Sequence, residues 1–149
     1  MKLRISLTII IFLAVLGIAD SGYALHQHYA PPETSACDFN ATVSCTAINQ
    51  SEYSVLLGMP VAALGMAGYA LIAGLAAAMI FRFRERTVAW LLLALAIPAL
   101  VFSLWLTWIE IFVLKAVCPL CVTSLFVITS ITVLAVLAVW SGRGEMTDS

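Results

Sequence analysis

Charged residues are scarce in this 149-residue chain, because Asp, Glu, Lys and Arg make up only 10% of it, against about 25% in soluble domains. Seven basic and eight acidic residues nearly cancel, and a net charge of -1 gives no basic surface for binding nucleic acid. Apolar residues reach 63%, which excludes both a disordered segment and a water-facing globule. The lipid bilayer is therefore the expected solvent, and no nucleic-acid partner is expected.

The alternation of polar and apolar residues that marks a barrel strand is also missing. Instead, four apolar runs each reach the length of about 20 residues that a membrane-spanning helix needs, at about 5–23, 54–81, 88–113 and 118–140. We predict an all-α integral membrane protein with a single membrane domain over residues 1–149. Its architecture is a four-helix bundle with a long extracytoplasmic loop, at about 24–53, between helices 1 and 2.

The basic residues predict the orientation of the bundle, because Lys and Arg in short flanks and loops favour the cytoplasmic side. All but Lys115 fall on one side of the predicted spans: Lys2, Arg4, Arg82, Arg84, Arg86 and Arg143. Both termini are therefore predicted to be cytoplasmic, and the long loop and the turn at Lys115 to lie outside. A cleavable N-terminal signal ending near Ala24 is an alternative that would leave three spans in the same orientation.

Cysteines number only four, and all are predicted on the outward side, where disulfides form and persist. Cys37 and Cys45 lie in the long loop, and Cys118 and Cys121 open the last span as a Cys-x-x-Cys motif. Pro119 suits the first position of a helix, which makes Cys118 the residue that caps it. The unpaired amides and dipole of the helix start are expected to lower the thiol pKa of Cys118.

Four cysteines allow three pairings, and the sequence does not select among them. A zinc site is disfavoured because seven residues separate Cys37 from Cys45, too many for a short knuckle, so no metal is expected. Static disulfides and a redox relay of two dithiol pairs remain. The relay is favoured, because a mobile loop pair above a pair at a helix start suits electron transfer from a soluble protein to an acceptor in the lipid.

Together these motifs resemble the bacterial form of the vitamin K epoxide reductase family, over about residues 5 to 140. The matching elements are Cys37-x7-Cys45, Ser51, Gly58-Met59-Pro60 followed by Gly65, and Cys118-x-x-Cys121. The resemblance implies a four-helix bundle around a quinone, ubiquinone or menaquinone, which acts as the electron acceptor. It also implies the bacterial inner (cytoplasmic) membrane, with the redox cysteines on the periplasmic side.

The resemblance further implies a role for each site residue. Cys37 exchanges disulfides with a periplasmic thioredoxin-fold oxidant, and Cys45 shuttles electrons to Cys118. Cys121 faces the quinone. Ser51 lies beside the site as a hydrogen-bonding residue near the quinone or the shuttle cysteine.

Two departures from the family pattern shape the expectation. Many bacterial relatives carry a fused thioredoxin-like domain after the last span, whereas this sequence stops at Ser149, so the partner is expected to be a separate protein. The animal enzymes carry a tyrosine where this chain has Leu125. A plain quinone rather than an epoxide is therefore the expected acceptor.

We therefore predict an enzyme, a thiol:quinone oxidoreductase that converts a substrate dithiol and a quinone into a disulfide and a quinol. One alternative is a small four-helix transporter with Glu110 as the ion-coupling residue and structural disulfides. Another is a non-catalytic assembly subunit. Glu110 is predicted near the outward end of the third helix, either as a hydrated interfacial acid or on a proton route for quinone reduction. His26 and His28 are expected in an exposed loop.

Overall fold

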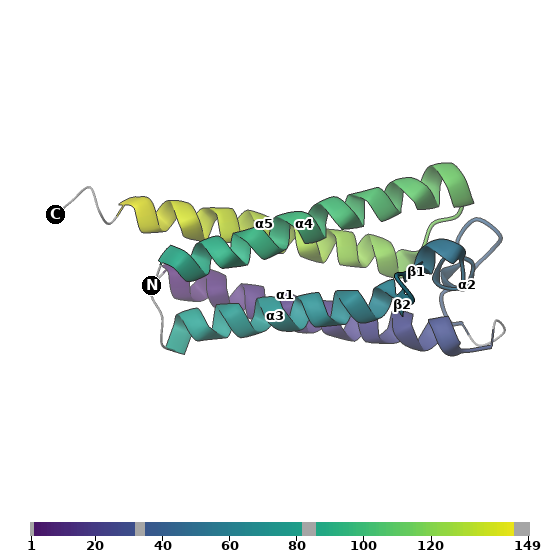
Figure 1. Ribbon diagram of the computed structural model, residues 1–149, viewed down its shortest axis with the longest axis horizontal. Helices are drawn as coiled ribbons and strands as arrows, with labels where there is room; N and C mark the ends of the chain where they lie inside the picture. Colours follow the sequence, from purple (N-terminus) through teal and green to yellow (C-terminus); the bar gives the residue numbers. More distant parts are fainter. Residues whose placement is uncertain (1, 32–34, 82–85, 145–149) are drawn as a thin grey trace.

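Four long helices form a bundle in the computed structural model, which describes residues 2–31, 35–81 and 86–144 (Figure 1). They are α1 (Lys2–Tyr29), α3 (Val61–Phe81), α4 (Arg86–Ile109) and α5 (Pro119–Gly144). Figure 1 shows α1 running beside α3 and α4 beside α5. Each contains a span long and apolar enough to cross a membrane. The predicted all-α membrane bundle is confirmed, and the chain is a multi-pass membrane protein.

Short elements gather at one end of this bundle (Figure 1). They are the helix α2 (Cys45–Asn49), the 3-10 turn η2 (Glu52–Ser54), and the antiparallel strands β1 (Val55–Leu56) and β2 (Met59–Pro60). At the same end, α4 continues into the π-helical turn η3 (Glu110–Leu114) before the chain turns into α5. We call this the cysteine end, because Cys45 of α2 and Cys118 just before α5 lie there.

The predicted boundaries of the first two spans are wrong by six or seven residues. Helix α1 continues to Tyr29 rather than ending near residue 23, because this last part still buries side chains such as Ala24 and Gln27. Helix α3 begins at Val61 rather than near residue 54. Before it, Leu57 and Gly58, with φ of 53° and 83°, turn the chain back between β1 and β2. The connection between the first two spans therefore runs from about residue 30 to 60 instead of 24 to 53.

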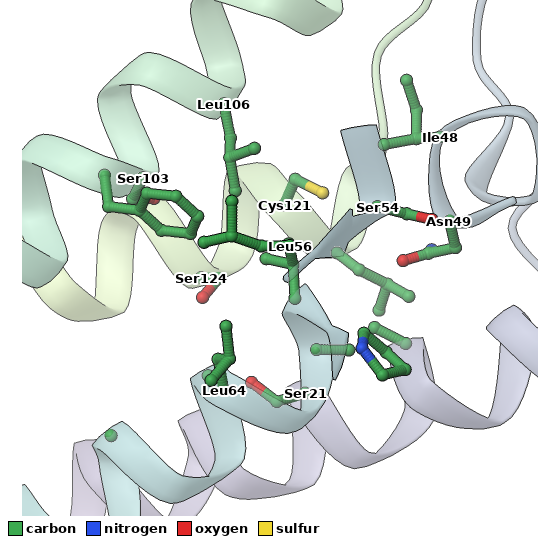
Figure 2. Close-up of a pocket in the computed structure, with 18 of the residues that line it drawn as sticks. Ser21, Ile48, Asn49, Ser54, Leu56, Leu64, Ser103, Leu106, Cys121 and Ser124 are labelled. Atoms are coloured by element: carbon green, nitrogen blue, oxygen red, sulfur yellow. The ribbon is translucent and has the colours of Figure 1, made fainter. Parts of the chain in front are cut away.

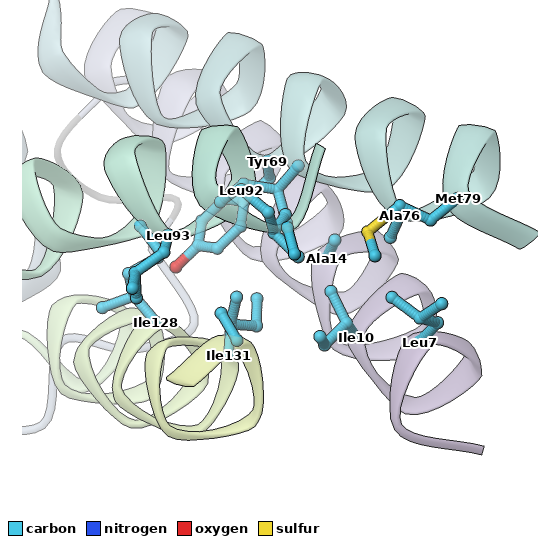
Figure 3. Close-up of a cluster of buried hydrophobic side chains, with 14 of the residues drawn as sticks. Leu7, Ile10, Ala14, Tyr69, Ala76, Met79, Leu92, Leu93, Ile128 and Ile131 are labelled. Carbon is cyan, nitrogen blue, oxygen red and sulfur yellow. The ribbon is translucent and has the colours of Figure 1, made fainter. Parts of the chain in front are cut away.

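All four long helices contribute to one hydrophobic core (Figure 3). Helix α1 supplies Leu7, Ile10 and Ala14 among others, so its first half is an integral part of the bundle. Small residues let α1 and α3 approach closely: a Cβ atom added at Gly17 would lie 2.7 Å from the ring of Tyr69. Close packing through small residues is what a bundle in lipid requires, because lipid gives no hydrophobic drive for association.

The orientation of the bundle in the membrane stays a prediction that rests on its basic residues. Arg4 lies near the start of α1, at the end opposite Lys115, which follows η3. Arg82 and Arg84, on which that prediction also rests, lie outside the described residues.

Candidate redox site

The loop disulfide between Cys37 and Cys45 is fixed by hydrogen bonds around Asp38. The carboxylate of Asp38 accepts hydrogen bonds from the Ser44 hydroxyl (2.8 Å) and the Thr46 backbone N–H (3.0 Å). Desolvation acts to raise the pKa of Asp38, but the hydrogen bonds from Thr46 and Ser44 prevail and lower it. The start of α2 is thereby tied to the residue that follows Cys37.

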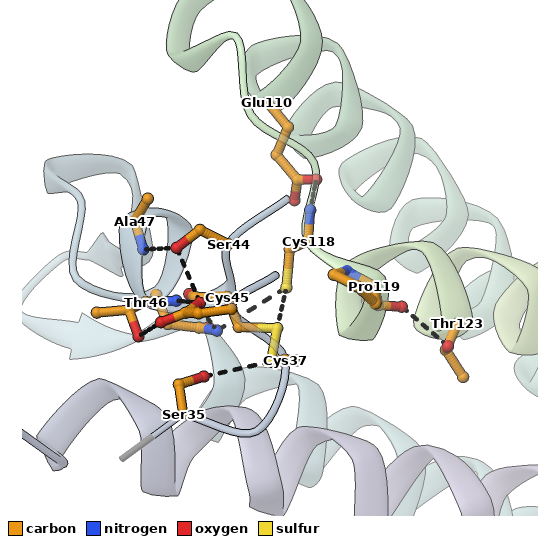
Figure 4. Close-up of a disulfide and its surroundings, with 12 residues drawn as sticks. Ser35, Cys37, Ser44, Cys45, Thr46, Ala47, Glu110, Cys118, Pro119 and Thr123 are labelled. Atoms are coloured by element: carbon orange, nitrogen blue, oxygen red, sulfur yellow. Dashed lines mark hydrogen bonds between the residues drawn. A yellow bond between two sulfur atoms is a disulfide. The ribbon is translucent and has the colours of Figure 1, made fainter. Parts of the chain in front are cut away.

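A short parallel backbone bridge joins this loop to the segment before α5. Val43 pairs with Val117, and the Val117 N–H donates to the carbonyl of Thr42 at 2.8 Å. Cys45 lies two residues after Val43, and Cys118 lies one residue after Val117. The bridge thus brings together two cysteines that are 73 residues apart in the chain, with 3.5 Å between their sulfur atoms (Figure 4).

The four sulfur atoms differ in exposure. Cys45 and Cys118 are fully buried, and they pack with Ile48 and Ala116 in a small cluster of their own. Cys37 and Cys121 are only partly buried. The disulfide joins Cys37 to Cys45, while Cys118 and Cys121 are free thiols. Only Cys37 of the loop pair is therefore open to a partner from outside.

Cys118 lies just ahead of α5, which begins at Pro119. The Cys121 thiol lowers the pKa of Cys118 most, by hydrogen bonding, and the backbone N–H groups of Cys121 and Leu120 lower it further. Burial and the nearby charge of Glu110 act in the opposite direction, but the net effect is a lowered pKa. A thiol of this kind is a good nucleophile and a good leaving group in disulfide exchange.

Two further side chains contact this cysteine pair, and the sequence did not indicate either contact. The Asn49 amide donates to the carbonyl of Cys45 at 3.0 Å and lies 4.0 Å from the Cys118 sulfur. One oxygen of Glu110 accepts a hydrogen bond from the Cys118 backbone N–H at 3.3 Å. The spacing of Asn49, four residues after Cys45 on a helix, was an available signal. The position of Glu110 depends on the π-helical turn η3 and on Lys115, whose φ is 51°. No spacing rule predicts either feature.

A cavity of about 450 Å³ opens beside Cys121, between the long helices and the short elements of the cysteine end (Figure 2). Most of its wall is apolar, with side chains such as Leu64 and Leu106. A few polar groups reach it, among them Ser21 and Ser124. Its volume and lining suit a small apolar ligand with polar oxygen atoms.

Ser51 also lines this cavity, but its hydroxyl donates to the carbonyl of Ile48 at 2.7 Å. His28 lies in α1 rather than in a loop and reaches the cavity wall, where its Nδ1 forms a hydrogen bond with the carbonyl of Asn49. His26 is exposed, although it too lies in α1. The structure thus brings the cysteine end of α1 to the cavity that Cys121 lines.

Comparison with known proteins agrees with this geometry. The model of the vitamin K epoxide reductase family matches residues 8–136, a range that reaches from α1 into α5 and includes all four cysteines. A search of the curated proteins finds no match. The match covers most of the chain, so this protein belongs to the vitamin K epoxide reductase family of membrane oxidoreductases.

Proposed function

We propose that this protein is a thiol:quinone oxidoreductase that reoxidises a periplasmic thioredoxin-fold partner and passes two electrons to a membrane quinone. The observation that carries the proposal is the 3.5 Å contact between the Cys45 and Cys118 sulfurs, beside a cavity that Cys121 lines. Through this contact, a disulfide formed next to the cavity can be transferred to the loop. The net reaction converts a partner dithiol and a quinone into a partner disulfide and a quinol.

The exposure of the cysteines supports a fixed order of exchange. The partner's thiolate attacks Cys37, the only sulfur of the loop disulfide that is partly exposed. Once a quinone has oxidised Cys118 and Cys121 to a disulfide, the released Cys45 thiolate attacks Cys118, whose sulfur lies 3.5 Å away, and Cys121 leaves as a free thiol. The second thiolate of the partner then breaks the bond to Cys37, so that the partner leaves as a disulfide. The freed Cys37 attacks Cys45, which restores the loop disulfide and leaves Cys118 and Cys121 as a dithiol. The structure has the loop disulfide and two free thiols at Cys118 and Cys121. In this proposal that is the state that reduces a quinone.

The cavity supports a quinone as the acceptor. Its volume of about 450 Å³ and its largely apolar wall fit a quinone head group, and Cys121 lies at that wall. A bound ubiquinone or menaquinone supplies a two-electron acceptor. Ser51 lines the same cavity and contacts such a head group in this proposal, although its hydroxyl must rotate away from Ile48 to donate a hydrogen bond to it.

We assign the protein to the bacterial inner membrane, with both termini in the cytoplasm and the cysteine end in the periplasm. The separation of Arg4 from the cysteine end supports this orientation. The oxidising periplasm keeps the loop disulfide formed.

The alternative of a transporter with Glu110 as its ion-coupling residue has less support. Glu110 does not stand alone in the membrane, because it contacts the backbone of Cys118. The cysteines are also not arranged as two separate structural disulfides, because two of them are free thiols that lie beside the others. These contacts favour redox chemistry over transport.

The decisive experiment uses purified protein in nanodiscs with a reduced thioredoxin-fold protein and a soluble ubiquinone analogue. Wild-type protein is expected to reduce the quinone as the partner is oxidised, and Cys121→Ala to abolish quinone reduction. Cys121→Ala is expected to retain the exchange between Cys37 and the partner, which a trapped mixed disulfide reveals. Undiminished quinone turnover in Cys121→Ala would refute the proposal.

A further inference from the structure

Glu110 is buried, and only one of its two carboxylate oxygens has a hydrogen-bond partner among the described residues. Only 2% of the residue is exposed. Its oxygen Oε2 accepts a hydrogen bond from the Cys118 N–H, but Oε1 is buried and has no hydrogen-bond partner among the residues that the structure describes. No ion pair links it to a basic side chain in the described ranges 2–31, 35–81 and 86–144. A carboxylate in such a place is costly unless it binds a proton.

The surroundings of Glu110 are the reacting groups of the proposed function. It lines the cavity together with Cys121, and its charge is felt by the thiols of both Cys118 and Cys121. Figure 4 shows its carboxylate directed at the backbone of Cys118. Its own carbonyl accepts a hydrogen bond from the Ala116 N–H at 3.1 Å across η3, which fixes the backbone from which the side chain extends.

Oxidation of a dithiol by a quinone moves protons as well as electrons. Two S–H bonds break and one S–S bond forms, while two electrons and two protons pass to the quinone and form two O–H bonds. The thiol that faces the cavity needs a base to remove its proton, and the quinone oxygens need an acid. Glu110 is placed to serve as both, since it adjoins the thiols and the cavity.

We propose that Glu110 accepts the proton of the Cys121 thiol as the dithiol is oxidised and returns that proton to the acceptor in the cavity. The carboxylate is restored at the end of each turnover, so the net reaction is unchanged. This inference rests on the proposed function. The other titratable side chains at the cavity wall are Asp20 and His28 of α1, Tyr53 of η2, Tyr69 of α3 and Cys121 of α5.

The first test needs no quinone. In a Cys118→Ala background, Cys121 is the one thiol outside the loop disulfide, and the amide that binds Glu110 is retained. We would measure alkylation of Cys121 by a small neutral iodoacetamide, by mass spectrometry, between pH 6 and 8. With Glu110 as its base, the rate is expected to level off once Glu110 has lost its proton, whereas an unassisted thiol below its pKa reacts about tenfold faster per pH unit.

The substitution Glu110→Gln keeps the size of the side chain and its ability to accept from the Cys118 N–H. We expect it to slow the alkylation of Cys121 at pH 7 and to restore the steep pH profile. If Glu110 acted only by its charge, the same substitution would speed the reaction, because removal of a nearby negative charge favours the thiolate. Glu52→Gln, in exposed η2 at the same end of the bundle, is the matched control and should leave the rate unchanged.

The second test separates the two halves of the reaction. In the otherwise wild-type protein, Glu110→Gln should slow quinone reduction about 100-fold, the usual size of a lost general base. Transfer of the loop disulfide to a reduced partner, followed without quinone, should change less than about threefold. An equal loss in both steps, a fast E110Q enzyme, or an alkylation rate of Cys121 in Cys118→Ala that stays steep up to pH 8 with Glu110 intact would overturn the role of Glu110. Failure of the wild-type protein to reduce any quinone would instead overturn the proposed function.

Discussion

The contact between Cys45 and Cys118 predicts a crosslink in a variant that lacks the other two cysteines. In Cys37→Ala/Cys121→Ala, the two remaining sulfurs have no alternative partner within the chain. They are 3.5 Å apart and must approach by about 1.5 Å to reach the length of a disulfide bond. We expect this disulfide to form almost completely under mild oxidation.

The size of the stabilisation follows from the length of the loop that the crosslink closes. Linking residues 73 apart destabilises the unfolded chain by about 4 kcal/mol in the chain-entropy treatment. This is an upper value, because an unfolded protein retains some structure. The oxidised double variant is therefore expected to unfold at a higher temperature than the same protein in reductant.

Mass spectrometry of a non-reducing digest identifies the crosslink, and thermal unfolding with and without reductant measures its effect. The control is Cys45→Ala/Cys118→Ala, which leaves Cys37 and Cys121, the partly buried member of each pair. We expect this control to crosslink more slowly. Equal crosslinking in both variants, or none between Cys45 and Cys118, would refute the arrangement of the site.

Three other changes test the fold around the site. Gly17→Ala should lower stability by about 1–3 kcal/mol in thermal unfolding, because its Cβ would meet the Tyr69 ring, whereas Gly74→Ala, with open space around it, should not lower it. Tyr69→Phe removes the hydroxyl that bonds to α5 and should cost about 1 kcal/mol in the same assay. Because hydrogen bonds lower the pKa of Asp38, its carboxylate should stabilise the loop at every pH above the pKa of an ordinary aspartate. This stabilisation should vanish as the pH falls through the lowered pKa of Asp38. Hydrogen exchange at the Thr46 amide should accordingly become less protected in acid, beyond the intrinsic pH effect, and Asp38→Asn should remove that dependence.

The sequence was sufficient for the features that depend on local composition. Four apolar runs predict four helices, because the backbone in lipid has to satisfy its own hydrogen bonds. Pro119 predicts the start of α5 correctly, since a proline fits the first turn of a helix. The same reasoning failed at the cysteine end of α1, where the apolar run becomes polar while the helix continues to Tyr29. It failed again before Val61, where an apolar segment turns back as β1 and β2.

By itself, the sequence determined that this chain lies in a membrane, that it is helical and that it has two cysteine pairs at one end. Only the tertiary structure decided that Cys45 meets Cys118, that Asn49 and Glu110 adjoin them, and that Cys121 lines a cavity. The helices are apolar almost all round, so their periodicity does not reveal which faces pack together. The site also depends on one backbone bridge between distant segments and on a π-helical turn, and neither is encoded by the residues near it in the sequence.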